Sequence, residues 1–335
     1  MATPATTARE RAAKWARWLL PLVALVLALF FLRDQLPFLG EAWDALARAS
    51  VGPVVAAVVV AYVSIVAMSG VRQVLLNSQG HIVGFPPCNR LSLASNAWST
   101  TVPGGPAISA WFTFNVHRSW GASVGLCGWF IVISSALSTV WLVAIGVLSV
   151  AVLGADLSLP ALAASLAASV GVALALYWVA RNPNTMQRAV RHLPGRIERP
   201  VADVVGQIAA VRMSTGAFAS SAVLSLLNRV LDAATYYFAA LAITDDPALR
   251  SVMLAFVMTK LAGTAQVTPG GVGTVDAVGV GVLAAGGFSL GDATAITLLY
   301  RLISFVLITA IGWVYYFIFY AGRGYVLGAP ATPER

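Results

Sequence analysis

The strongest constraint on this chain is a series of long apolar stretches that are almost free of charge. An α-helix needs roughly 20 apolar residues to cross a hydrocarbon core about 30 Å thick. Six stretches reach or approach this length: 18–32, 51–70, 122–153, 159–180, 214–243 and 292–321. They predict an all-α polytopic membrane protein with about six transmembrane helices.

The composition excludes the common soluble classes. Hydrophobic residues make up 59% of the 335 residues and charged residues only 10%, with a mean hydropathy of +0.82. A soluble domain carries roughly 45–50% apolar and about 25% charged residues. The net charge of +8 comes from scattered basic residues that form no nucleic-acid patch. Cys88 and Cys127 provide no disulfide framework.

Two further apolar stretches are interrupted near their middle. The interruptions are Pro103-Gly104-Gly105, within residues 91–116, and Pro269-Gly270-Gly271, within residues 251–285. Proline removes a backbone donor and glycine weakens a helix, so each limb covers about half a membrane. Irregular backbone at that depth must be buried in protein or line a wet cavity. We therefore interpret both stretches as re-entrant helical hairpins; proline-kinked transmembrane helices and pairs of interfacial helices are the alternatives.

The basic residues predict an orientation. With a cytoplasmic N-terminus and two re-entrant hairpins, cytoplasmic segments hold 15 of the 21 Lys and Arg residues. Short loops rich in Lys and Arg stay in the cytoplasm. If the first hairpin alone crossed completely, the basic loop 181–213 would lie outside, against this rule. The pattern predicts a multi-pass protein of the inner (plasma) membrane with both termini in the cytoplasm.

The order helix, hairpin, helix occurs twice within a single predicted transmembrane domain, 1–335. The first unit is 51–153 and the second unit is 214–321, and the crossing at 159–180 would turn the second upside down. Inverted repeats with broken helices near the midplane recur in transporters. The units share little sequence beyond Pro-Gly-Gly, so chance similarity is the alternative.

Five ionisable residues fall inside the predicted apolar zone: Arg229, Asp232, Lys260, Asp276 and Arg301. Each costs about 2.5–3.5 kcal/mol on insertion scales, so a cavity or a partner is expected. Arg229 and Asp232 share a helix face, and Arg301 could pair with Asp276. Purely structural pairing is the alternative to a role in binding. Lys260 has no carboxylate on its own helix, so it either faces a cavity or snorkels.

The tip of the second hairpin, residues 268–274, is the most informative segment. Glycines let backbone amides converge on a ligand, and Thr274 is expected to cap the next helix. A helix N-terminus suits an anion such as a lipid phosphate, provided that Asp276 is paired. Close helix packing is the alternative role of these glycines. The predicted substrate-binding residues are Pro103, Gly104, Gly105, Arg229, Asp232, Lys260, Pro269, Gly270, Gly271, Gly273, Thr274, Asp276 and Arg301.

Catalytic patterns are missing from the sequence: it has no Ser/His/Asp set, metal-ligand spacing, phosphate-binding loop or dinucleotide fingerprint. We therefore expect a protein that is not an enzyme and needs no cofactor or metal.

Residues 269–277, PGGVGTVDA, and the later Tyr300-Arg301 resemble the lysylphosphatidylglycerol synthase transmembrane-region family, whose members are flippase-like. That family usually has glutamate where this chain has Asp276. Many members also have an arginine and a Gly-Glu pair after the first proline, which this chain lacks. The resemblance implies movement of lipids, often anionic or lipid-linked, between leaflets. It does not extend to a soluble aminoacyl-transferase domain, so we do not expect this chain to make lysyl-lipid.

Three functions remain open from the sequence. The first is a lipid flippase or transporter whose partners are membrane lipids, anionic ones above all, and not nucleic acid. The second is an accessory subunit of a membrane glycosyltransferase or lipid synthase. The third is a small-solute transporter.

Overall fold

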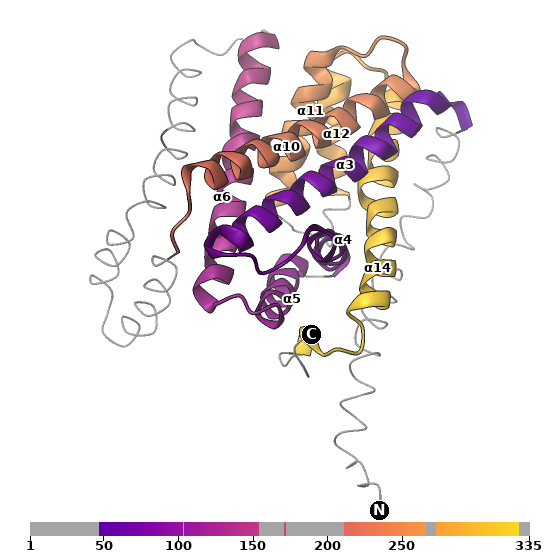
Figure 1. Ribbon diagram of the computed structural model, residues 1–335. Helices are drawn as coiled ribbons and strands as arrows, with labels where there is room; N and C mark the ends of the chain where they lie inside the picture. The colour runs from indigo at the N-terminus through magenta and orange to yellow at the C-terminus, as the bar shows by residue number, and fades with distance from the viewer. Residues whose placement is uncertain (1–46, 103, 154–170, 172–210, 266–272, 328–335) are drawn as a thin grey trace, which may run out of the picture.

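The structure is a computed structural model that describes residues 47–102, 104–153, 171, 211–265 and 273–327 (Figure 1). The longer elements among these residues are all helices, as the sequence predicts. They are α3 (Val51–Leu76), α4 (Phe85–Thr101), α5 (Gly105–Ser119), α6 (Val124–Leu153), α10 (Thr215–Ile243), α11 (Leu249–Ala265), α12 (Thr274–Ala285), α13 (Leu290–Arg301) and α14 (Ile308–Phe319). A π-helical turn, Leu302–Leu307, joins α13 to α14.

Three helical segments of the described chain are long and apolar enough to cross a membrane. They are Val51–Gln79, Val124–Ser149 and Leu290–Phe319. All three coincide with predicted spans, and they carry large apolar side chains on their outer faces, such as Val59 and Ile318. α10 occupies a fourth predicted span, while the predicted span 18–32, and all of 159–180 except residue 171, lie outside the described residues.

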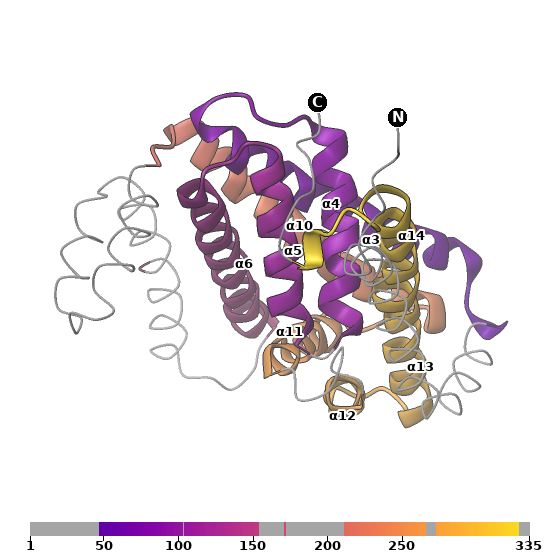
Figure 2. The same cartoon turned by 90° about the horizontal axis from the view of Figure 1, so that it is seen from below.

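Both predicted hairpins form pairs of packed helices, α4 with α5 and α11 with α12. Figure 2 shows the first pair lying between α6 and α14. Gly104 turns the chain with a left-handed φ of 68°, and a Cβ on Gly105 would lie 2.4 Å from the carbonyl oxygen of Ser99. Glycine is therefore required at both positions of this tip. Pro103 and the tip residues 266–272 lie outside the described residues.

α3 and α10 are the first helices of the two predicted units, and they lie side by side, crossing obliquely in front of α6 and α14 (Figure 1). The two run antiparallel, because Ser50 at the start of α3 donates its N–H to the carbonyl of Ala242 at 2.8 Å. Ala57 of α3 and Ala240 of α10 are small, fully buried members of one core cluster. Small residues let helix backbones approach closely where lipid provides no hydrophobic driving force.

The two units also exchange contacts through glycines in their last helices. Gly312 of α14 lies against the backbone of Leu93 on α4, and Gly146 of α6 lies against Val257 on α11. The two glycines are equally far along their long helical segments, counted from Leu290 and from Val124. Their partners, Leu93 and Val257, are likewise equally far from the first residue of their hairpins. Each hairpin thus packs on the closing helix of the other unit, at matching positions.

The last turns of α3 differ from the prediction, which placed Arg72 in a cytoplasmic segment. α3 continues to Leu76, and Arg72 is only 4% exposed. Its guanidinium lies 3.2 Å from Nε2 of His117 on α5 and 3.4 Å from Oγ of Ser95 on α4. A basic residue near a predicted helix end is easily assigned to the following loop. Arg72 is instead part of the helix and packs in the core.

Candidate functional site: a polar cavity at mid-helix depth

A cavity of about 620 Å³ lies where the two units meet. The long helical segments line it with residues 61–68 of α3, 138–142 of α6, 228–232 of α10 and 300–308 of the segment Leu290–Phe319. These residues lie near the middle of each segment. All three membrane-length segments therefore reach the cavity at half their length.

The hairpins line the cavity with the limb residues closest to their tips. Asn96, Ser99 and Thr100 come from the last turns of α4, while Lys260 and Gly263 come from the corresponding part of α11. Gly104 and Gly105 do not line the cavity. From the first hairpin, the cavity is thus lined by side chains of α4 rather than by these two tip glycines.

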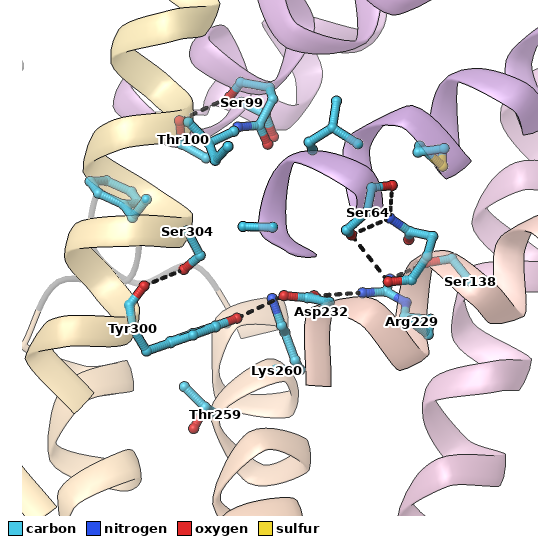
Figure 3. Close-up of a pocket in the computed structure, with 18 of the residues that line it drawn as sticks. Ser64, Ser99, Thr100, Ser138, Arg229, Asp232, Thr259, Lys260, Tyr300 and Ser304 are labelled. Carbon is cyan, nitrogen blue, oxygen red and sulfur yellow. Dashed lines mark hydrogen bonds and ion pairs between the residues drawn. The ribbon is translucent and has the colours of Figure 1, made fainter. Parts of the chain in front are cut away.

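Asp232 is the central charged group of the cavity. One carboxylate oxygen lies 2.7 Å from Nζ of Lys260 and 3.8 Å from a guanidinium nitrogen of Arg229, and the other accepts a hydrogen bond from the Tyr300 hydroxyl at 2.9 Å. Figure 3 shows Asp232 between the two cations, with Ser99 and Thr100 across the space from them. Arg229 also donates to the hydroxyl of Ser138. Four helices therefore share one charge network.

Arg301 forms a second ion pair. Its Nε donates to Oδ1 of Asp276 at 2.6 Å, and the two side chains are 13% and 7% exposed. The other carboxylate oxygen of Asp276 accepts the N–H of Gly273 at 2.9 Å, which closes the first turn of α12. The sequence predicted this pairing. Asp276 is consequently neutralised and does not repel an anion at this end of the cavity.

The cavity has an excess of positive charge. Arg229, Lys260 and Arg301 are its cations, and Asp232 and Asp276 are the carboxylates that contact them. Among the described residues the cluster therefore has a formal charge of +1. An unbalanced cation inside an apolar bundle is costly unless water or an anion accompanies it, so the cluster requires one of the two beside it.

A reciprocal pair of hydrogen bonds joins α3 to α10 at the cavity wall. Nδ2 of Asn228 donates to the backbone carbonyl of Ser64 at 2.9 Å, and Oγ of Ser64 donates to the carbonyl of Asn228 at 3.1 Å. The sequence analysis identified neither of these two residues as a partner of the other. No local signal marks a lone serine in an apolar helix as the partner of a residue far along the chain.

The structure places the other predicted residues as follows. Thr274 is the first residue of α12 rather than its cap, because Gly273, with φ 84°, precedes the helix and donates its N–H to Asp276. Lys260 pairs with a carboxylate on another helix, which its own sequence neighbours could not reveal. Pro103, Pro269, Gly270 and Gly271 lie outside the described residues.

Uncharged hydrogen-bonding groups make up much of the remaining wall: Ser64, Asn96, Ser99, Thr100, Ser138, Asn228, Thr259 and Ser304. Within the described ranges, no group of three or more His, Cys, Asp or Glu residues is arranged to hold a metal ion. The wall can therefore hold an anion and donate hydrogen bonds to polar atoms beside it.

These features define a polytopic α-helical membrane protein with a polar, cationic cavity between two helical units. A family model described as "Lysylphosphatidylglycerol synthase TM region" matches residues 14–312. The chain belongs to this family of integral membrane proteins, and the match supports a role connected with lipid modification or transport. No curated protein matches the chain.

Proposed function

We propose that this protein is a lipid flippase of the inner membrane, which moves lipids with anionic headgroups between leaflets without itself catalysing a reaction. The observation that carries the proposal is the depth of the cavity. Segments of membrane length reach it at mid-length, so a headgroup bound there would be halfway between the leaflets. Membership in a lipid-related family agrees with this.

Movement between leaflets requires a site that opens to each side in turn, and an inverted repeat provides this. We propose that the units 51–153 and 214–321 form such a repeat, with α4–α5 and α11–α12 as re-entrant hairpins. Two features support it: the first helices of the units run antiparallel, and each hairpin packs on the other unit's closing helix. Rocking of one unit against the other would then open the cavity alternately.

The proposed orientation, with both termini in the cytoplasm, agrees with the contacts at the two ends of the bundle. Asn115, at the end of the first hairpin, donates to the carbonyl of Tyr325 beyond the last predicted helix, and this topology places both on the cytoplasmic side. At the opposite end Ser50 contacts Ala242, and both lie at the outer ends of the helices predicted at 51–70 and 214–243. Contacts between segments far apart in sequence thus join residues that the basic-residue rule places together.

Reconstitution tests the proposal. Purified protein in vesicles is expected to move fluorescent anionic phospholipid between leaflets, measured by quenching of the outer label. Lys260→Gln removes the cation closest to Asp232 and is expected to slow movement about tenfold, a loss of about 1.4 kcal/mol of transition-state stabilisation. Arg250→Gln, an exposed change outside the cavity, is the control and should leave the rate unchanged. Inactivity of the wild type across a broad panel of lipids would refute the proposal.

A further inference from the structure

The cavity wall is built from matching positions of the two units. Counted from the first residue of each helix, Ser64 of α3 occupies the same position as Asn228 of α10, and Asn96 of α4 the same position as Lys260 of α11. With the last long segment counted from Leu290, seven such pairs make up two thirds of the lining: Ser64/Asn228, Ile65/Arg229, Met68/Asp232, Asn96/Lys260, Ser99/Gly263, Ser138/Ser304 and Leu142/Ile308. The wall is therefore symmetric in position.

The chemistry of these pairs is not symmetric. Every charged member belongs to the second unit, and its counterpart in the first unit is uncharged: Ile65 for Arg229, Met68 for Asp232 and Asn96 for Lys260. Arg301 also belongs to the second unit. The hairpin side of the first unit instead presents the amide of Asn96 and the hydroxyls of Ser99 and Thr100. The described wall thus consists of a charged half and a neutral, hydrogen-bonding half.

We infer that the cavity divides one lipid headgroup between these halves: the second unit holds a phosphate that carries a single negative charge, and the first unit holds an uncharged polyol. This assignment rests on the proposed lipid transport and specifies its substrate class. The charged half has an excess of one cation, which one phosphodiester neutralises. Amide and hydroxyl groups on the other half match the hydroxyls of a glycerol or sugar moiety.

An amine-bearing headgroup fits this wall poorly. Its ammonium group would need a carboxylate, and the described wall offers Asp232, which already contacts Lys260 and Arg229. The described first-unit lining contains no acidic residue. Moving a cation into a cavity that already has an excess of positive charge is unfavourable at low dielectric. Zwitterionic and cationic lipids are therefore expected to bind more weakly.

Three lipids with identical acyl chains distinguish the contributions of the two halves of the cavity to binding. Phosphatidylglycerol has both the monoanionic phosphate and the polyol, phosphatidylethanolamine replaces the polyol with an amine, and phosphatidylmethanol keeps the charge without a polyol. Binding to the detergent-solubilised full chain, measured by native mass spectrometry, is expected to favour phosphatidylglycerol about tenfold over each of the others. Glycerol phosphate, a water-soluble probe, should not compete, and equal competition would refute the lipid assignment.

Two variants should affect the two ratios differently. Lys260→Asn gives the second unit the residue found at the matching position of the first. It should reduce the preference over phosphatidylethanolamine, because the excess positive charge that disfavours the ammonium is gone, and keep that over phosphatidylmethanol. Asn96→Ala should reduce both preferences, because neither phosphatidylethanolamine nor phosphatidylmethanol has the polyol. Thermal unfolding in detergent identifies any variant that has lost its fold, and Arg250→Gln is again the control. If Lys260→Asn alters both ratios equally, if Asn96→Ala leaves the ratio over phosphatidylmethanol unchanged, or if the wild type shows no preference, the division of the headgroup is wrong.

Vesicle assays with the same lipids separate this inference from the proposed function. Movement of all three lipids at one rate would contradict the headgroup assignment and leave lipid transport standing. Selective binding without movement would contradict transport and leave the binding assignment standing.

Discussion

The carboxylate of Asp232 contacts three side chains, two of which belong to helices other than its own. Removing one partner of a buried ion pair usually costs more than replacing the whole pair, because the remaining charge is left uncompensated. Single substitutions in the two ion-pair systems, Asp232 with its cations and Asp276 with Arg301, therefore have different consequences for the remaining charge. Asp232 balances two cations, whereas Asp276 and Arg301 form a pair that double substitution can neutralise.

Asp276→Asn is expected to lower stability by on the order of 3 kcal/mol, because the nearly buried guanidinium of Arg301 then loses this countercharge. The asparagine oxygen can still accept the N–H of Gly273, so the start of α12 keeps its bond. The double variant Asp276→Asn/Arg301→Gln should recover much of the loss in thermal unfolding measured by tryptophan fluorescence.

Transport by this double variant separates pairing from binding. If Arg301 contacts the substrate, the double variant regains stability but not lipid movement. Full recovery of both would show that the pair is purely structural. A double variant as unstable as Asp276→Asn would contradict the ion-pair argument itself.

The charged residues of the site could be found from the sequence, because an ionisable residue in an apolar stretch needs a functional or structural reason. The partner of Lys260 could not be found, since helix spacing relates residues of one helix and says nothing of which helices touch. Asn96 and Ser99 were missed for a related reason. Small polar residues are ordinary in membrane helices, and only the fold shows that these face the charged half.

At the scale of whole elements, glycines control how closely the two units pack. A Cβ on Gly312 would lie 2.4 Å from the carbonyl oxygen of Leu93, whereas one on Gly146 would lie 3.1 Å from a methyl group of Val257. A side-chain methyl can shift slightly within its surroundings, but a helix backbone cannot do so without displacing the whole helix.

Gly312→Ala is therefore expected to destabilise the protein by about 1–3 kcal/mol, through overpacking between α14 and α4. Gly146→Ala should cost less. Gly216→Ala is the matched control, because that glycine meets nothing within 4 Å. Unfolding temperatures in detergent give the order of stability, and equal values for Gly312→Ala and Gly216→Ala would contradict the close contact.

Each unit ties its first helix to its own hairpin at a matching position, since Arg72 and Tyr236 are equally far from the first residues of α3 and α10. In the first unit Arg72 contacts Ser95 and His117, one on each limb. In the second unit the Tyr236 ring packs on Phe256, and its hydroxyl lies beside Gly279. The same connection is polar in one unit and aromatic in the other.

The Arg72 connection predicts an unequal pair of substitutions. His117→Ala leaves a buried guanidinium without one of its acceptors, at a cost of about 1.5–3 kcal/mol. Arg72→Met removes the charge and keeps most of the side-chain volume, and replacement of a buried charge by a packed apolar group is often close to neutral. Thermal unfolding should rank His117→Ala as the less stable variant, and the reverse order would refute this account of Arg72.

At the scale of the whole molecule, the proposed topology places Gln79 and Asp246 on opposite sides of the membrane. Asp246→Cys should react with a membrane-impermeant maleimide on intact cells, whereas Gln79→Cys should react only after permeabilisation. The wild type is a clean background, because Cys88 and Cys127 are fully buried. Labelling of both variants from the same side would contradict the proposed topology, as expected if the first hairpin, which lies between these two positions, crosses the bilayer once.

The sequence predicted the all-helical class, the positions of the three membrane-length segments and the two interrupted stretches, because apolar length and glycine-proline interruptions are local signals. It did not predict the packing of α4 on α14 or of α6 on α11. That arrangement depends on Gly146 and Gly312. Hydropathy does not distinguish these two glycines, because their role in packing depends on which helix contacts them.

The cavity combines a symmetric frame with charges that belong to one half. If one unit rocks against the other as proposed, the half that bears Lys260 and Arg301 moves within the transmembrane electric field. The neutral half has no charge that could offset this movement. A full elementary charge crossing about 100 mV does about 2.3 kcal/mol of work, so even a partial displacement biases the equilibrium. The membrane potential would thus make one of the two conformations, open to the inside or open to the outside, the more populated one, although the two units have matching folds.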